Sequence, residues 1–170
     1  MLIRELRESD IGDYLALRAE ALLDDPLAFT SSPEDDTSST ADSLRRQMQS
    51  RDWALFVAID GERMAGSVGM VRRHHLKAAH KMNVWGMYVS PAHRGRGIGA
   101  ALLDAAIEHA RGMNDVARLE LGVSSSAGAA QRLYERAGFA AWGSEPDALR
   151  YAGTSVTEHH MSLDLHGHPA

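Results

Sequence analysis

The sequence contains no cysteine. This absence excludes a disulfide framework and a thiol nucleophile, and it fits a reducing compartment, so we expect a cytoplasmic protein. No apolar run approaches the roughly 20 residues that span a bilayer, and the charged first ten residues do not resemble a secretory leader. The net charge of −5 disfavours nucleic acid as a partner, because proteins that bind it usually carry a basic face. We therefore expect neither a membrane nor a nucleic-acid partner.

Hydrophobic periodicity predicts a mixed α/β fold with about six to seven strands and about four helices. The length of 170 residues suits one domain, which we expect over residues 1–165, with a flexible tail at 166–170. Ser9 or Asp10 is expected to cap the first helix. Strands are expected at residues 2–6, 54–60, 63–72, 81–89, 117–123, 139–142 and 156–165. Helices are expected at residues 11–22, 41–50, 97–111 and 127–137.

The stretch VSPAHRGRGIGAALL joins an expected strand to an expected helix. Gly95, Gly97 and Gly99 alternate there with other residues, and Arg94 and Arg96 lie among them. A helix start leaves up to about four backbone amides without partners, and the helix dipole places about half a positive charge there. Glycines let a bulky anion reach those amides, and arginines add charge-assisted hydrogen bonds. The stretch therefore predicts a phosphate-binding turn.

Two kinds of nucleotide site compete for this turn. The letters GRGIGA match the dinucleotide pattern G-x-G-x-x-A, which would indicate an oxidoreductase. The match lies past the middle of the chain, however, and too little sequence follows it to complete a doubly wound sheet. Glu120 lies about 20 residues further on, but in the middle of its strand, whereas a ribose-binding acid belongs at a strand end. A P-loop is excluded because no Gly-Lys-Ser/Thr follows the glycines.

Two motifs together resemble the GCN5-related N-acetyltransferase (GNAT) family. Arg94–Gly99, R-G-R-G-I-G, is similar to the family's acyl-CoA-binding signature Arg/Gln-x-x-Gly-x-Gly/Ala. Ala130–Phe139, A-Q-R-L-Y-E-R-A-G-F, is similar to its A-x-x-L-Y-E-x-x-G-F motif. The resemblance covers nearly the whole chain and implies the GNAT fold. It also implies acetyl transfer from acetyl-CoA to a primary amine, on a small molecule or a peptide, by direct attack.

The resemblance also assigns the cofactor-binding residues. The strand before the turn would bind pantetheine through its backbone at Met87, Tyr88 and Val89. The turn would bind the pyrophosphate through Arg94, Gly95, Arg96, Gly97, Ile98 and Gly99. The family often has an asparagine where this chain has Ala127, so Ser126, or its neighbours from Ser124 onward, would replace that contact.

Tyr134 corresponds to the family's tyrosine that protonates the departing thiolate. The attacking amine must lose a proton, and the residues leave its general base open between Glu120 and His80, since the strand before the turn carries no carboxylate. Histidines cluster at residues 74–80 and 159–160, but no carboxylate lies at a diagnostic spacing, so we expect no metal.

The acceptor is only hinted at. Between Asp24 and Asp42 lie six acidic residues and no lysine or arginine, which could attract a cationic amine. Phe29, Trp53 and Trp142 are candidates for lining its pocket. Dimers are common in the family, so a homodimer is one expected state. The rival function within the same family is a module that binds acyl-CoA without turnover.

Overall fold

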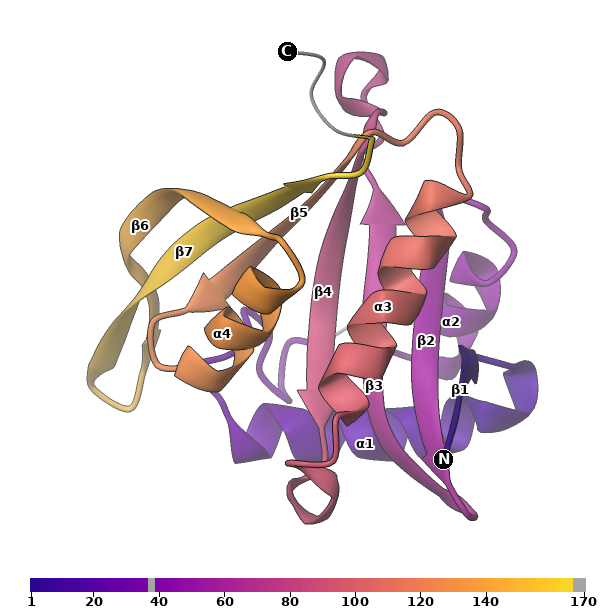
Figure 1. The fold of residues 1–170 in the computed structure, drawn as a ribbon. Helices are drawn as coiled ribbons and strands as arrows, with labels where there is room; N and C mark the ends of the chain where they lie inside the picture. Colours follow the sequence, from indigo (N-terminus) through magenta and orange to yellow (C-terminus); the bar gives the residue numbers. More distant parts are fainter. Residues whose placement is uncertain (37–38, 167–170) are drawn as a thin grey trace.

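The computed structural model describes residues 1–36 and 39–166. Its centre is one twisted sheet with helices on both faces (Figure 1). The strands are β1 (Leu2–Glu5), β2 (Trp53–Asp60), β3 (Arg63–Arg72), β4 (Lys81–Val89), β5 (Arg118–Ser124), β6 (Ala140–Tyr151) and β7 (Thr154–Asp164). The helices are α1 (Ile11–Asp24), α2 (Ala41–Gln47), α3 (Ile98–Arg111) and α4 (Gly128–Arg136), and three short 3₁₀ turns lie at Glu8–Asp10, Leu76–Ala78 and Pro91–His93. The predicted order of strands and helices is confirmed.

The sheet has the order β1-β2-β3-β4-β5-β7-β6. Only β4 and β5 pair in parallel, and every other neighbouring pair is antiparallel. The strand that leads into the glycine turn therefore runs antiparallel to the strand before it. A doubly wound dinucleotide fold needs a mostly parallel sheet, so this topology excludes the oxidoreductase alternative.

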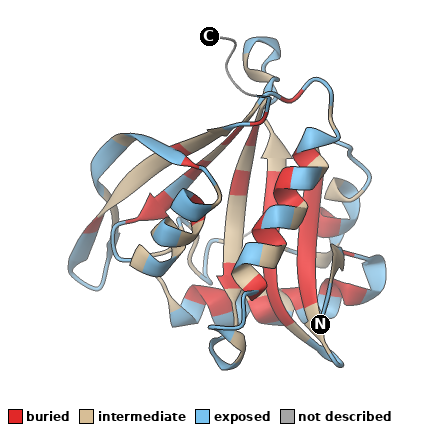
Figure 2. Ribbon diagram, in the orientation of Figure 1, coloured by how far each residue is buried: buried red, intermediate tan, exposed pale blue. Residues whose placement is uncertain are grey.

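The alternation of β2 shows how the two faces are buried. Ala54, Phe56 and Ala58 belong to the core cluster that includes the inner side of α3. Leu55 and Val57 point the other way and pack in the cluster under α1 and α2. Successive strand side chains face opposite sides of a sheet, so a strand buried on both faces reads as an unbroken apolar run. Figure 2 shows the burial concentrated in β2, β3 and the inner face of α3.

Two expectations about the ends of elements need correction, and a third lies almost entirely outside the described residues. The strand expected at 139–142 is the twelve-residue β6, most of which is exposed. Asp10 does not cap α1 through its side chain; its carboxylate accepts hydrogen bonds from the Arg7 amide at 2.8 Å and from the Arg4 guanidinium at 2.6 Å. Of the tail expected at 166–170, only His166 lies within the described residues, and its Nε2 is 3.0 Å from the Val116 carbonyl oxygen. Within the described residues, no helix is long and apolar enough to cross a membrane.

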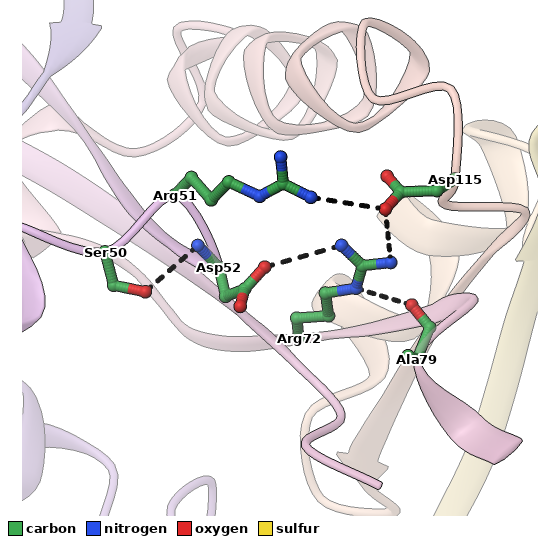
Figure 3. A network of polar contacts seen from close by, with 6 residues as sticks. All are labelled: Ser50, Arg51, Asp52, Arg72, Ala79 and Asp115. Carbon is green, nitrogen blue, oxygen red and sulfur yellow. Dashed lines mark hydrogen bonds and ion pairs between the residues drawn. The ribbon is translucent and has the colours of Figure 1, made fainter. Parts of the chain in front are cut away.

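A polar network fixes the strands where β4 and β5 begin (Figure 3). The Arg72 guanidinium donates to the Ala79 carbonyl at 2.5 Å and to the Asp115 carboxylate at 2.7 Å, and it lies 3.4 Å from Asp52. Arg51 contacts the same Asp115 carboxylate at 3.4 Å. The hydrogen bond from Arg72 holds the pKa of Asp115 below its usual range. One side chain thus ties the β3–β4 connection to the loop that precedes β5.

Candidate active site

Strands β4 and β5 separate soon after they meet. Their parallel pairing covers only three residues of each strand, Lys81–Asn83 against Arg118–Glu120. Beyond Asn83, β4 continues for six residues to Val89 and keeps only its pairing with β3. On its other edge β5 pairs with β7 along its whole length, and beyond Glu120 this is the pairing that β5 keeps. Among the described residues, the second half of β4 therefore presents an edge without a partner strand, in the middle of the sheet.

Met87 and Val89 carry the backbone groups of this free edge. The Tyr88 carbonyl lies on the β3 side, 2.7 Å from the position that a Cβ on Gly66 would take. Because neighbouring residues of a strand direct their backbone groups to opposite edges, the groups of Met87 and Val89 face away from β3. The register between β3 and β4 shifts at Gly86, where φ is +63°, so β4 also carries a bulge beside this edge. A free edge of this kind can bind an extended ligand as a further strand would.

The glycine turn leads from β4 into α3 with its backbone exposed. Gly95 and Gly97 have φ values of +74° and +77°, which favour glycine, and a Cβ built on either would meet nothing within 4 Å. Among the described residues, no acceptor is found for the amides of Gly95, Arg96 and Gly97. Ile98 is buried and anchors the first turn of α3 in the core. The turn therefore offers unpaired amides at a helix N-terminus, which is a site for an anion.

The two arginines of the turn are both paired with carboxylates of the chain. Arg94 donates to Asp24 and, at 2.9 Å, to the Val89 carbonyl. Arg96 donates to Asp60 at 2.9 Å, with about half of its side chain exposed. The hydrogen bond from Arg94 lowers the pKa of Asp24. Arg94 thus holds the turn against α1 and the end of β4, and Arg96 is the more available cation.

The Tyr88 side chain points to α1 and away from the free edge. Its hydroxyl lies 3.0 Å from Glu20 and 3.2 Å from Asp24. Burial, followed by these two carboxylates, raises the pKa of Tyr88 well above its ordinary value. Tyr88 was expected to bind pantetheine through its backbone, but its carbonyl lies on the β3 side and its hydroxyl at α1, so neither group faces the free edge.

Tyr134 lies on α4 and is 6% exposed. Its ring packs edge-on against Phe139, with ring centroids 5.9 Å apart, in the same core cluster as Met87 and Val89. Burial raises the pKa of the Tyr134 hydroxyl well above its ordinary value. The hydroxyl makes no hydrogen bond with any residue that the structure describes. Tyr134 is therefore a protonated phenol in the core cluster against which Met87 and Val89 pack.

Ser126 lies in the turn between β5 and α4. Its hydroxyl is 2.8 Å from that of Ser124, and its amide donates to the same Ser124 oxygen at 3.3 Å. Ser124 is buried, whereas Ser126 is exposed. The pair places the Ser126 hydroxyl at the surface, directly before Ala127. The asparagine that the resemblance led us to expect as a cofactor contact is missing at Ala127.

The two base candidates lie in different places. Glu120 is at the point where β4 and β5 part, and it accepts hydrogen bonds from Lys81 at 2.7 Å and from Arg73 at 3.2 Å. Burial alone would raise the pKa of Glu120, but these two cations outweigh it and lower the pKa. His80 precedes β4, and its side chain is exposed. Seven residues, or about 23 Å of extended strand, separate it from Met87.

Three of the six carboxylates in the acidic segment are paired with arginines of the chain. Asp36 accepts from Arg18 at 2.9 Å, Asp42 accepts from Arg45 at 3.1 Å, and Asp24 binds Arg94. Two residues of the segment, 37 and 38, lie outside the described residues. The carboxylates named here are therefore not free to attract a cation.

Sequence reasoning missed another acidic group, which only the sheet brings together. Ligand atoms of Glu145, Glu158 and His160 lie within 4.8 Å of one another, because Glu145 and Glu158 face each other across β6 and β7. Glu158 and His160 are two residues apart along β7. This i, i+2 spacing is the sequence feature that could have indicated the group. Spacing along the chain cannot reveal a partner such as Glu145, which lies on a neighbouring strand.

Comparison with known proteins identifies the family. The family model described as "Acetyltransferase (GNAT) family" matches residues 17–139. No curated protein matches the chain significantly.

Solved structures share the fold. An acetyltransferase from Salmonella typhimurium, determined with its cofactor acetyl-CoA, has a TM-score of 0.87 at 23% identity, covering 100% of this chain and 96% of that one. A ribosomal-protein-alanine N-acetyltransferase from Brucella melitensis has a TM-score of 0.82 at 24% identity, covering 97% and 100%. A phosphinothricin acetyltransferase from Sinorhizobium meliloti, in complex with acetyl-CoA, has a TM-score of 0.84 at 18% identity, covering 96% and 88%. With the family model matching more than half of its length, the chain belongs to the GNAT acetyltransferase family.

Proposed function

We propose that this protein transfers the acetyl group of acetyl-CoA to a primary amine by direct attack. Acetyl-CoA is the acyl donor in this family, and when bound it supplies the acetyl group as a reactive thioester. The observation that carries the proposal is the joining of a free strand edge to a bare glycine turn at the start of α3. An adenine nucleotide with a long extended arm needs both features.

The residues present fit this donor. The positions where side chains would stand on Gly95 and Gly97 are open space, and the amides of the turn find no acceptor among the described residues. These amides would bind the pyrophosphate together with Arg96. Arg94 would keep the turn in place, because its guanidinium already binds Asp24 and the Val89 carbonyl.

The free edge would bind the pantetheine arm. The backbone of Met87 and Val89 faces this edge, and an amide there would polarise the reacting carbonyl, an effect worth about 3–4 kcal/mol when preorganised. The Val89 carbonyl is already shared with Arg94, so Met87 is the residue we expect to contribute most. Ser126 would supply the hydroxyl that replaces the contact missing at Ala127.

Tyr134 would protonate the departing thiolate. A thiol of this kind has a pKa of about 8.5, and an ordinary phenol has one of about 10. Because burial raises the pKa of Tyr134 further, its hydroxyl stays protonated across neutral pH. Such a general acid contributes typically about 10²–10⁴-fold to a rate.

Glu120 would assist the loss of the proton from the acceptor. An alkylamine of pKa about 10.4 is neutral at pH 7 only at a cost of about 4.6 kcal/mol. Glu120 is ionised at neutral pH because Lys81 and Arg73 lower its pKa. It is therefore always ready to accept a proton, directly or through water, but it is a weak base. His80 has no role in this proposal because of its distance from Met87.

The class of acceptor does not follow from the fold. One structural neighbour is named for the alanine of a ribosomal protein, and another is named for phosphinothricin. The same scaffold thus serves acceptors of unlike shape, and the acceptor must be inferred from the cavity beside the free edge.

The test is a steady-state assay of free-thiol release from acetyl-CoA with a panel of amines. We expect release to accelerate when an acceptor is added. Tyr134→Phe should lower kcat about 10²-fold with little change in the melting temperature, because the hydroxyl it removes bonds to no described residue. Binding of acetyl-CoA without acceptor-dependent release would instead identify a non-catalytic binding module. Full kcat in Tyr134→Phe would remove the proposed role of that tyrosine.

A further inference from the structure

A cavity of about 250 Å³ opens beside the point where β4 and β5 part. Its walls come from β4, β5, β6 and β7 and from the segment between α1 and α2, which contributes Thr30. A water molecule accounts for about 30 Å³ of liquid volume, so the cavity holds about eight non-hydrogen atoms. That space is larger than a bare ion needs, and it suits a small organic molecule.

The positive charges in and beside this cavity are already paired. Arg73 lines it, but the Arg73 guanidinium and the Lys81 ammonium both bind Glu120. Glu120 therefore contributes no unbalanced negative charge, and the two cations against one carboxylate leave one positive charge beside the cavity. Glu120 also cannot be displaced without separating two ion pairs.

Glu158 is the carboxylate of this cavity that lacks a cation. Its oxygens lie over Gly122, 2.3 Å from the position that a Cβ would take there, so only glycine leaves room for them. In the described part of the chain, the Glu158 side chain makes no hydrogen bond and no ion pair, although its backbone pairs with β5 and β6. Glu145 does not line the cavity itself, but it lies opposite Glu158 on β6, and its carboxylate is within 4.8 Å of the ligand atoms of Glu158 and His160. Among the described residues its ion-pair contact is with the His160 imidazole at 3.4 Å. The carboxylates of Glu145 and Glu158 thus converge beside the cavity, and their two negative charges outweigh the one positive charge that Arg73 and Lys81 leave after pairing with Glu120.

An exposed indole completes the cavity. Trp142 is 64% exposed, which is unusual for so large an apolar side chain. Its ring stacks on His160, with the centroids 5.3 Å apart and the planes at 25°. The face of an indole attracts cations, and the attraction is strongest where water is partly excluded. An aromatic wall beside two carboxylates is the chemistry that recognises an organic ammonium group.

We propose that Glu145, Glu158, Trp142 and His160 form a cation-binding pocket for the acceptor, so that the acceptor is an amine with a second positive charge. This inference rests on the proposed acetyl transfer and names its substrate class. An ammonium held against two carboxylates has its pKa raised, which makes it a poor nucleophile. The pocket therefore holds the group that does not react. The reacting amine of the same molecule lies toward Glu120 and Met87.

Two amines that differ by one charge test the proposal. The probes are 1,4-diaminobutane, which has six non-hydrogen atoms and fits the cavity, and 1-aminobutane, which lacks the second ammonium group. We expect kcat/KM to favour the diamine by about tenfold or more, mainly through KM. In Glu158→Gln and Glu145→Gln this preference should fall by about tenfold, while kcat/KM for the monoamine stays within about twofold. Glu108→Gln, an exposed substitution on α3 whose partner is Arg111, is the matched control and should behave as wild type.

Calorimetric titration of the diamine, in EDTA to exclude a bound metal, separates this inference from acetyl transfer. If neither amine accelerates thiol release but the diamine binds and Glu158→Gln abolishes its binding, the pocket is supported and the acetyl transfer fails. If both amines are acetylated equally well and neither substitution matters, the pocket is refuted and the acetyl transfer stands. Diamine binding that vanishes in EDTA would assign Glu145, Glu158 and His160 to a metal ion and also refute the proposal.

Discussion

Replacing Gly97 by alanine separates the stability of the glycine turn from its ability to bind phosphate. Gly97 has a φ of +77° and immediately precedes α3. A residue with a Cβ costs about 1–2 kcal/mol more than glycine in this conformation. For a chain of this length, each kcal/mol shifts the melting temperature by about 2–4 °C. Gly97→Ala should therefore lower the melting temperature by about 2–8 °C.

The effect on binding should be larger than the effect on stability suggests. The Cβ meets no atom of the protein within 4 Å, so the methyl group stands in the space that a pyrophosphate would occupy. We expect the Kd for acetyl-CoA, measured by calorimetry well below the melting temperature, to rise by about tenfold or more, which is about 1.4 kcal/mol.

Gly12→Ala is the matched control for this substitution. Gly12 lies in α1 with open space around it and no positive φ, so alanine should stabilise the protein by about 0.5–1 kcal/mol and leave the Kd unchanged. A lowered melting temperature with an unchanged Kd in Gly97→Ala would refute the assignment of the turn to phosphate. An unchanged melting temperature would refute its left-handed conformation.

Three further predictions concern the base, the core and acid stability. Glu120→Gln should lower kcat about 10²-fold. The slope of its pH–rate profile between about pH 6 and 9 should match that of wild type. Glu120 has a lowered pKa, so the group that titrates in this pH range is the acceptor amine. A changed slope would assign the titration to Glu120. Leu102→Ala, at a site 0% exposed, should cost about 2–5 kcal/mol and lower the melting temperature by about 4–20 °C in calorimetry; a smaller loss would contradict the packing of α3 on the sheet. The pKa of Asp10 is lowered by the Arg4 hydrogen bonds, so the stability they confer is complete above about pH 4 and is lost as the pH falls through the folded pKa. In urea unfolding, Asp10→Asn should be less stable than wild type at about pH 6, and the difference should shrink toward about pH 2; a constant difference would refute this pairing.

The order of the elements was predictable because most of them carry a clear period. The apolar stripe of α3 and the continuous apolar run of β2 are strong local signals. The glycine turn was predictable for the same reason, since its spacing and its position before a helix are both local. In β6 the signal fails: the strand lies at the sheet edge and is mostly exposed, and Pro146 interrupts it.

The residues that sequence reasoning missed depend on contacts between distant segments. Asp10 has the residue type of a helix cap, but Arg4 and Arg7 take its carboxylate. Glu145 and Glu158 come together only through the register of β6 and β7. The acidic segment was visible in the sequence, but the arginines that pair with several of its carboxylates come from elsewhere in the chain. Local pattern therefore predicts the donor side of the site, while the acceptor side requires the sheet.

The central claim is that the free edge of β4 and the bare amides before α3 bind acetyl-CoA. Backbone amide NMR during titration with acetyl-CoA tests it most directly, since those amides report their own hydrogen bonds. We predict that the largest shifts fall on Met87, Val89 and residues 95–99, with saturation at one equivalent. Saturable binding that moves other amides and leaves these unshifted would contradict the account, as would the absence of any shift.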